Sequence, residues 1–143
     1  MKYGAYLVFA ILFACKSTPP AVATACHDDK LNVGQRWTYK TRPQEPNSTA
    51  IILRIDCNAS GAVNAVHIRL EDVDLPKGPT ERQHVAPHVP MDRATLIADL
   101  RDMVGTVDPL PEFPGYQDWL DNKGGVFTLP IAKMLDVVEP SLK

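Results

Sequence analysis

Apolar and polar residues alternate along three stretches in the first half of the chain, residues 33–41, 49–57 and 62–71. A period of two places successive side chains on opposite faces of a strand, so each stretch predicts a strand. Because only a short turn at residues 58–61 separates the last two stretches, they predict antiparallel neighbours. The three stretches together predict a three-stranded meander.

The pattern also predicts which face of each strand is buried. In residues 49–57 we expect one apolar face of Ile51, Leu53, Ile55 and Cys57, and an opposite face of Ile52, Arg54 and Asp56. In residues 62–71 we expect Val66, Ile68 and Leu70 to point inward, and His67, Arg69 and Glu71 to point outward. Cys57 therefore falls on the apolar face, which suits a buried disulfide.

The middle of the chain predicts an edge strand and one long helix. Four prolines lie between residues 72 and 90, so we expect a loop at residues 76–80 and an edge strand at residues 83–89, where proline is tolerated. Residues 92–104 predict a helix that Asp92 caps and Gly105 ends. Its apolar stripe consists of Leu96, Ile97, Leu100, Met103 and Val104.

Two shorter helices are expected near the end of the chain. Tyr116, Trp119 and Leu120 suggest one or two helical turns, and residues 126–129 are expected to return to the sheet. Pro130 begins a last helix, whose inner face carries Ile131, Met134, Leu135 and Val138. The predicted fold class is therefore α+β, an antiparallel sheet of about four strands with two or three short helices packed on one face.

The first fifteen residues have the parts of an export signal. Lys2 gives a positive start, and the apolar run of residues 5–14 is too short to cross a bilayer as a helix, which needs about twenty residues. The run closes on Leu12-Phe13-Ala14-Cys15, which resembles the lipobox of bacterial lipoproteins. That resemblance implies cleavage before Cys15, lipidation of Cys15 and attachment to the lipid bilayer.

A second cleavage site is also present. Cleavage after Ala25, at Ala23-Thr24-Ala25, would leave a soluble protein that begins at Cys26. We prefer Cys15 because it directly follows the apolar run. In lipoproteins of this kind a residue other than Asp after the cysteine, here Lys16, implies the outer membrane. We therefore expect a lipid-anchored protein of the cell envelope, on the periplasmic face of the outer membrane.

Three segments follow from this interpretation. Residues 1–14 are the signal peptide, residues 15–30 the lipidated cysteine and a proline-containing tether, and residues 31–143 a single α+β domain. If Cys15 carries lipid, Cys26 and Cys57 remain as a pair in an oxidising compartment, and we expect a disulfide rather than two buried free thiols. The chain-entropy model assigns such a bridge roughly 3–4 kcal/mol of stability.

Composition and motifs exclude several classes of function. The net charge is −2, and the scattered Lys and Arg residues argue against nucleic-acid binding, which needs a basic stripe. None of the serines lies in a Gly-x-Ser-x-Gly motif, and a glycine-rich phosphate loop is absent. We therefore predict no catalytic residue and no cofactor.

His84 and His88 are the candidates for a metal site. Their spacing of four would place both on one face of a helix, but Pro87 lies between them and argues against a helix. With Asp92 or His27 they could form a site in a loop. We favour solvent-exposed histidines and predict no metal site.

Two acidic clusters are the remaining candidates for chemistry. They are His27-Asp28-Asp29, in the expected tether, and Glu71-Asp72-Asp74, at the end of a strand. Paired carboxylates do acid–base work when one is buried and its pKa is raised. The pattern places neither cluster in a pocket, and for Glu71-Asp72-Asp74 we expect a solvated turn.

Aromatic residues suggest a contact with another protein. Tryptophan and tyrosine are enriched at binding hot spots, and Phe113 lies between Pro111 and Pro114 where an exposed contact is expected. We therefore predict Phe113 and Tyr116 as partner-binding residues, and expect Trp37 and Trp119 to pack in the core. Residues 125–139, with the opening strand, resemble a group of small uncharacterised exported bacterial proteins, which implies no particular activity.

The function predicted is a non-enzymatic binding or structural role, in the manner of an inhibitor or immunity protein toward another envelope protein. The alternative is a small periplasmic enzyme or metal-binding protein that uses His84, His88 and nearby carboxylates.

Overall fold

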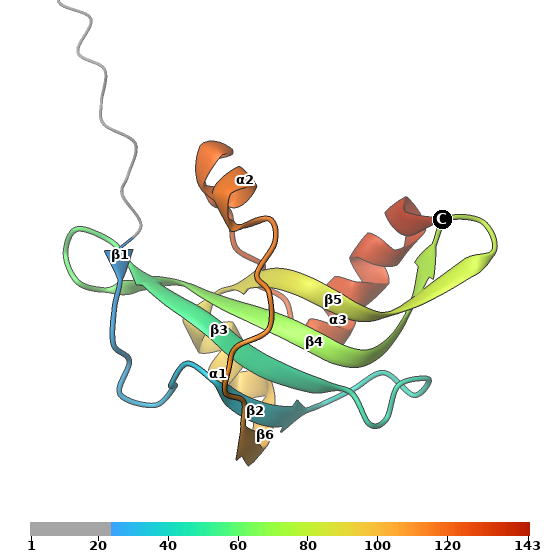
Figure 1. Ribbon diagram of the computed structural model, residues 1–143, viewed down its shortest axis with the longest axis horizontal. Coiled ribbons are helices and arrows are strands. Elements are labelled where there is room, and N and C mark those ends of the chain that lie inside the picture. The colour runs from blue at the N-terminus through green and yellow to red at the C-terminus, as the bar shows by residue number, and fades with distance from the viewer. Residues whose placement is uncertain (1–23) are drawn as a thin grey trace, which may run out of the picture.

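The computed structural model describes residues 24–143, and the lipobox with Cys15 lies outside these residues. The described chain forms one six-stranded antiparallel sheet with the order β5-β4-β3-β2-β6, and β1 pairs separately with β3 (Figure 1). The elements are β1 (Thr24–Ala25), β2 (Gln35–Tyr39), β3 (Thr49–Cys57), β4 (Val63–Lys77), β5 (Glu81–Met91), α1 (Arg93–Asp99), β6 (Leu100–Thr106), α2 (Tyr116–Asp121), α3 (Ile131–Val138) and the 3₁₀ turn η1 (Glu139–Leu142).

The α+β class and the antiparallel sheet are confirmed, but the sheet has six strands rather than about four. The meander of β2, β3 and β4 and the edge position of β5 agree with the sequence pattern. The two additional strands are β1, which lies in the expected tether, and β6, which lies in the expected long helix. β1 escapes prediction because it has only two residues, and β6 because its apolar positions fit a helical period.

The two faces of the sheet are covered differently. On one face, here called the helical face, Leu96 of α1 and Ile131, Met134 and Leu135 of α3 join the main apolar core. The other face, here called the connector face, is crossed by residues 107–115 on their way from β6 to α2, in front of the strands in Figure 1. Because α2 packs on this second face, the expectation that all helices share one face is wrong.

A bulge in β3 changes the predicted register. Ile52 is opposite Ile68 of β4, but Arg54 is opposite His67, so Leu53 is an extra residue in β3. As a result Ile52 and Ile55 both lie in the apolar core of the helical face, although strict alternation places them on opposite faces. In β4 the prediction is confirmed for Val66, Ile68 and Leu70, which are fully buried in that core.

The predicted helix at residues 92–104 is correct only for its first half. Asp92 caps α1 by accepting a hydrogen bond from the Thr95 N–H at 2.9 Å, but the helix ends at Asp99. Leu100–Thr106 instead form β6, in which Leu100 pairs with Tyr39 and Met103 with Trp37 of β2. The outer side of β2 thus obtains a strand partner, which outweighs the local helical pattern.

The last residue of α1 also positions α3. The carboxylate of Asp99 is only 6% exposed and accepts the N–H of Ile131 at 2.9 Å. Pro130 precedes α3 without capping it, so Asp99 supplies the acceptor and the negative charge that a helix N-terminus favours. The start of the last helix and its buried residues Ile131, Met134 and Leu135 agree with the sequence prediction.

An ion-pair network connects the loop after β2 to the end of the chain. Arg42 is 3% exposed and donates to both carboxylate oxygens of Glu45, at 2.8 and 3.1 Å. It also donates to Glu139 at 2.6 Å and to Asp136 at 3.3 Å, both near the C-terminus. The Glu45 carboxylate in turn accepts the Asp74 N–H at 2.7 Å. The buried charge of Arg42 is therefore compensated by carboxylates from two parts of the chain, the loop after β2 and the C-terminal end.

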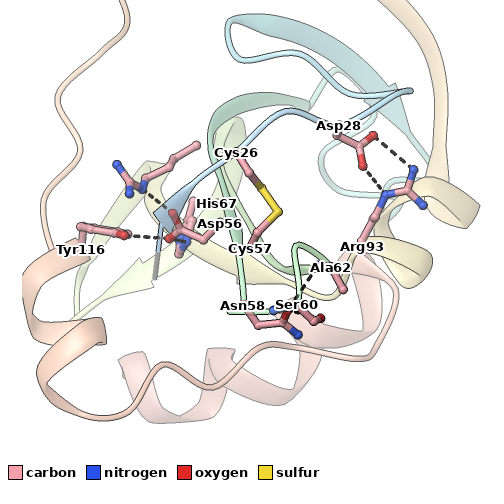
Figure 2. The surroundings of a disulfide bond; sticks show 11 residues. Cys26, Asp28, Asp56, Cys57, Asn58, Ser60, Ala62, His67, Arg93 and Tyr116 are labelled. Carbon is pink, nitrogen blue, oxygen red and sulfur yellow. Dashed lines mark hydrogen bonds and ion pairs between the residues drawn. A yellow bond between two sulfur atoms is a disulfide. The ribbon is translucent and has the colours of Figure 1, made fainter. Parts of the chain in front are cut away.

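The predicted disulfide is confirmed. Cys26 and Cys57 are bonded, 31 residues apart in sequence, and Figure 2 shows the bridge between the residue that follows β1 and the last residue of β3. The Cys26 N–H also donates to the Ile55 carbonyl at 3.0 Å. Part of the segment expected to be a tether, residues 24–30, is thus attached to the sheet.

Asp28 strengthens this attachment. It is 5% exposed and accepts the N–H groups of Lys30 and Leu31, at 2.8 and 2.9 Å, as well as two hydrogen bonds from Arg93 of α1. The Arg93 hydrogen bond is the main reason that the pKa of Asp28 is lowered to about 2. The first acidic cluster, which lies in the segment expected to be a tether, therefore holds one buried structural carboxylate.

We expect removal of the disulfide to lower the free energy of unfolding by roughly 3–4 kcal/mol, because the open chain regains the entropy of a loop of about thirty residues. The measurement is urea unfolding of the Cys26→Ser/Cys57→Ser variant, with Cys15→Ser in all samples so that only one pair of thiols is tested. Reduction of the parent chain should reproduce the double variant. A loss below about 1 kcal/mol would contradict the assigned stabilisation.

Candidate functional site

A chain of buried polar groups crosses the connector face. Asp56 of β3 and His67 of β4 are both 0% exposed, and His67 Nε2 lies 3.0 Å from Asp56 Oδ2. The other ring nitrogen, His67 Nδ1, lies 2.9 Å from Nε2 of His88 on β5. Adjacent strands of the sheet therefore align an aspartate and two histidines in one row, which runs from the centre of the sheet to its edge.

Asp56 receives three donors, each from a different element. Arg54 Nε donates to Oδ1 at 2.7 Å, and the Tyr116 hydroxyl donates to Oδ2 at 2.7 Å, beside the His67 bond. Figure 2 shows His67 and Tyr116 converging on this carboxylate. Because the carboxylate is an acceptor, His67 carries its proton on Nε2, and His67 Nδ1 accepts the N–H of His88 Nε2. The row of hydrogen bonds thus assigns a tautomer to each ring.

Aromatic side chains close the row against solvent. Phe113, Tyr116 and Trp119 all contact His67, with ring centroids 5.5, 5.2 and 4.5 Å away. The Arg54 guanidinium lies 4.6 Å from the centroid of the Tyr116 ring, a cation–π geometry. We call these three aromatic residues the aromatic cover, and they bring α2 and the preceding connector into contact with the sheet.

The two glycines after α2 allow the aromatic cover to close. A Cβ on Gly124 would lie 2.6 Å from the Trp119 ring, and the φ of +53° favours glycine at this position. The Trp119 indole N–H donates to the Gly125 carbonyl at 2.8 Å. Gly124-Gly125 therefore holds the tryptophan in place as well as ending the helix.

Burial determines the titration of the row. Desolvation lowers the pKa of His67 to about 4, against which the Asp56 charge acts only in part. Burial also lowers the pKa of His88 below its ordinary value of 6.5. For Tyr116, burial and the hydrogen bond to Asp56 raise the pKa to about 12. Both histidines are thus neutral and the tyrosine is protonated at neutral pH.

An apolar groove lies beside the outer end of this row. Its volume is about 320 Å³, and its walls come from β5 on one side and from α3 and η1 on the other. The lining residues are mainly apolar: Leu75, Gln83, Val85, Ala86, Pro87, His88, Val89, Phe127, Met134, Leu135, Val138 and Leu142. His88 is the one titratable side chain in this lining, and it belongs to both features.

The groove follows the open edge of the sheet. Within residues 24–143, β5 has a strand neighbour on one side only, β4. At its end an isolated parallel bridge joins Met91 to Phe127, whose N–H donates to the Pro90 carbonyl at 2.9 Å. Residues 126–129 were expected to form a strand of the sheet, but they contribute only this one bridge. Beyond it, residues 81–89 keep an unpaired outer edge.

The predicted site residues lie apart from one another. His84 is exposed and its Nδ1 lies 2.9 Å from the Val73 carbonyl, whereas His88 is half-buried and bonds to His67. His27 is exposed and Asp92 caps α1, so neither completes a site with them. In the described part of the chain, no group of three or more His, Cys, Asp or Glu side chains could hold a metal ion.

The second acidic cluster is engaged in ion pairs. Glu71 accepts from Arg36 at 2.7 Å and from Arg69 at 3.1 Å, and Asp74 pairs with Arg82 at 2.8 Å. Asp72 is exposed, with a positive φ of 56°. These carboxylates are partly exposed, and the cluster lacks the buried member that acid–base chemistry requires.

Phe113 and Tyr116 are half-buried, where sequence reasoning expected Phe113 to be an exposed contact. Their rings pack on His67 and, for Phe113, on His88 with centroids 4.8 Å apart. His67 was expected to point outward into solvent, and it does face outward from the core but is buried under these rings. Sequence reasoning missed Asp56 and His67 as functional residues; the only signal is the cluster of aromatic residues at positions 113–119.

Comparisons with known proteins found no matching family model, no match among curated proteins and no similar solved structure. Among the described residues, no helix is long and apolar enough to span a membrane.

We expect the protein to lose stability as the pH falls from about 6.5 to about 4. His67 has a pKa of about 4 in the folded protein and an ordinary value of 6.5, so the unfolded chain binds more protons in this window. The stabilisation is complete above pH 6.5 and is lost toward pH 4. For a difference of this size the loss is roughly 3 kcal/mol.

Urea unfolding between pH 7.5 and 4 measures this effect. In the His67→Gln variant an amide N–H can still donate to Asp56, and the pH slope attributable to the histidine should disappear. The control is His84→Gln on the exposed side of β5, which should keep the slope of the parent chain. An unchanged slope in His67→Gln would show that another group carries the dependence.

Proposed function

We propose that the chain is a binding protein of the bacterial cell envelope, anchored by lipid on Cys15, which captures an extended apolar segment of another envelope protein. The carrying observation is the open apolar groove along the unpaired edge of β5. The segment would add its backbone to β5 and place alternate side chains in the groove, as in known modes of strand addition. This is a non-enzymatic role of the inhibitor or immunity kind.

The occupant is inferred from the backbone of the edge as well as from the apolar walls. Phe127 already pairs with Met91 at the end of β5 through one parallel bridge. The outer edge of β5 can therefore pair with the backbone of another segment. An acyl chain would use the apolar walls but would leave the edge of β5 unused. A peptide strand satisfies both, because its main chain pairs with the edge while its side chains enter the groove.

Prolines limit what can pair there. Pro87 and Pro90 have no N–H to offer, and proline on an edge strand discourages indiscriminate pairing. The ladder with a partner would therefore be short, and burial of side chains would supply most of the affinity. Two apolar side chains in the groove contribute roughly 3–6 kcal/mol before the cost of ordering the peptide. Because a Kd of about 1 mM corresponds to about 4 kcal/mol, we expect a weak complex with a Kd near the millimolar range.

The alternative, a small enzyme or metal-binding protein that uses His84, His88 and nearby carboxylates, has one observation in its favour. His88 is connected through His67 to Asp56, an order of groups that can orient a general base. The groove, however, brings no hydroxyl, thiol or carboxylate to His88 among its lining residues. Binding is therefore the better supported function.

We expect the groove variant Val138→Glu to abolish selection of apolar peptides. The probe is a phage-displayed library of random 12-residue peptides, panned at pH 7.5 on the Cys15→Ser chain, which cannot be acylated. Enriched peptides should carry apolar residues at alternate positions, because a strand presents every second side chain to the groove. Synthetic copies should slow amide hydrogen exchange along β5.

Val137→Glu is the matched control, because Val137 is the neighbouring residue of α3, is 64% exposed and lies outside the groove lining. Near-ultraviolet circular dichroism should verify that both variants are folded. Peptides that bind the two variants equally, or that leave exchange along β5 unchanged, would contradict the proposal. Binding of a neutral hydrocarbon probe, N-phenyl-1-naphthylamine, in place of peptides would assign the groove to a lipid chain.

We expect the protein isolated from membranes to have the mass of residues 15–143 plus acyl chains, since the lipid on Cys15 is the proposed anchor. The measurement is intact-mass spectrometry, and Cys15→Ser should release the protein into the soluble fraction. An unlipidated mass that begins at Cys26 would instead support cleavage after Ala25 and a soluble periplasmic protein.

A further inference from the structure

His88 connects the proposed binding groove to the buried row of polar groups. His88 is one of the residues that line the groove, and its Nε2 lies 2.9 Å from His67 Nδ1. Beyond His67 lies the Asp56 carboxylate, which accepts hydrogen bonds from His67, Arg54 and Tyr116. A change in the charge of His88 therefore changes the electrostatic environment of the groove.

The geometry leaves one position on His88 where a proton can be added. With the Nε2 proton donated to His67, the remaining acceptor of the ring is Nδ1, which lies toward Gly115. A Cβ at Gly115 would lie 3.4 Å from this nitrogen, so the glycine leaves space beside it. Protonation at Nδ1 keeps the hydrogen bond to His67 intact, and the ring can become charged without a rearrangement of the row.

Protonation of both histidines is a different case. If His67 also carried a proton on Nδ1, two N–H groups would face each other across the 2.9 Å contact. The row can therefore accept one proton without losing the contact. His88 is half-buried and at the groove, whereas His67 is fully buried, so His88 is the group that exchanges with solvent first.

We propose that occupation of the groove is coupled to the protonation of His88, so that the apolar segment binds the neutral ring and is released as the pH falls. This inference rests on the proposed function. An apolar segment laid over His88 removes water from the ring, and removal of water disfavours the charged form. By linkage, protonation must weaken binding by the same factor as binding resists protonation.

The groups that face His88 support this direction. On β4 the neighbour is His67, whose charge would repel that of His88. On the connector the neighbours are Phe113, with ring centroids 4.8 Å apart, and Gly115, neither of which carries charge. The other polar side chain of the groove is Gln83, which donates to the Pro76 carbonyl. No carboxylate contacts His88 among these neighbours, so nothing there would hold its charged form when the groove is filled.

The experiment measures peptide affinity against pH, with a synthetic peptide selected on the Cys15→Ser chain at pH 7.5. Isothermal titration from pH 7.5 to 5.5, in two buffers of different ionisation enthalpy, gives both the affinity and the protons released. We expect affinity to fall by up to about tenfold per pH unit below the titration of His88, with proton release on binding. In His88→Gln the pH profile should be flat, and in His84→Gln it should match that of the parent chain.

The outcomes separate this inference from the proposed function. Binding with the same affinity at every pH, or a pH dependence that persists in His88→Gln, would overturn the coupling while the binding function stands. Absence of peptide binding at pH 7.5 would overturn both. Near-ultraviolet circular dichroism at pH 5.5 distinguishes release of the peptide from loss of the fold, and loss of the fold at that pH would also overturn the coupling.

Discussion

A carboxylate without access to solvent determines how the connector face is built. Removing an ionised group from water costs several kcal/mol unless hydrogen bonds replace the lost hydration. Asp56 meets this constraint with a guanidinium from its own strand, an imidazole from the neighbouring strand and a hydroxyl from α2. The helix α2 has six residues, too few to be stable alone, so its position depends on this bond and on the aromatic cover.

The need to satisfy the buried Asp56 carboxylate also explains why different kinds of side chain cover the two faces of the sheet. The helical face is packed with aliphatic side chains from α1 and α3, whose positions Asp99 and Arg42 help to determine. The connector face instead buries polar groups that satisfy one another. Its cover comes from a connector that carries Phe113 and from the short helix with Tyr116 and Trp119, rather than from a long amphipathic helix.

The local sequence pattern predicted the fold correctly where apolar residues recur with the period of a single type of secondary structure. The strands of the meander, the cap at Asp92 and the last helix after Pro130 follow from alternation, capping and an apolar stripe. The pattern failed where a distant partner decided the structure. Residues 100–104 have apolar positions that fit a helix, but the unpaired side of β2 recruits them as a strand. Likewise, a bulge at Leu53 depends on how β3 meets β4 and leaves no mark in composition.

The candidate site was less predictable than the fold. Asp56 and His67 occupy positions that alternation assigns to the outward face, and the side chains that bury them follow about fifty residues later in the chain. The pairing of Cys26 with Cys57 was predictable because the lipobox interpretation leaves just these two cysteines. The groove could not be predicted, because its walls come from β5 and from the C-terminal helices, which meet only in the folded protein.

The position of the disulfide has a mechanical consequence. The pairing of β1 with β3 involves two residues, and so short a ladder would peel apart under modest tension. The Cys26–Cys57 bond follows directly after β1 and transfers a pull on the N-terminal side of the chain to the end of β3, which is hydrogen-bonded on both sides. A domain held at that end would therefore be loaded along an inner strand of its sheet, where many hydrogen bonds must shear together before any one of them is lost.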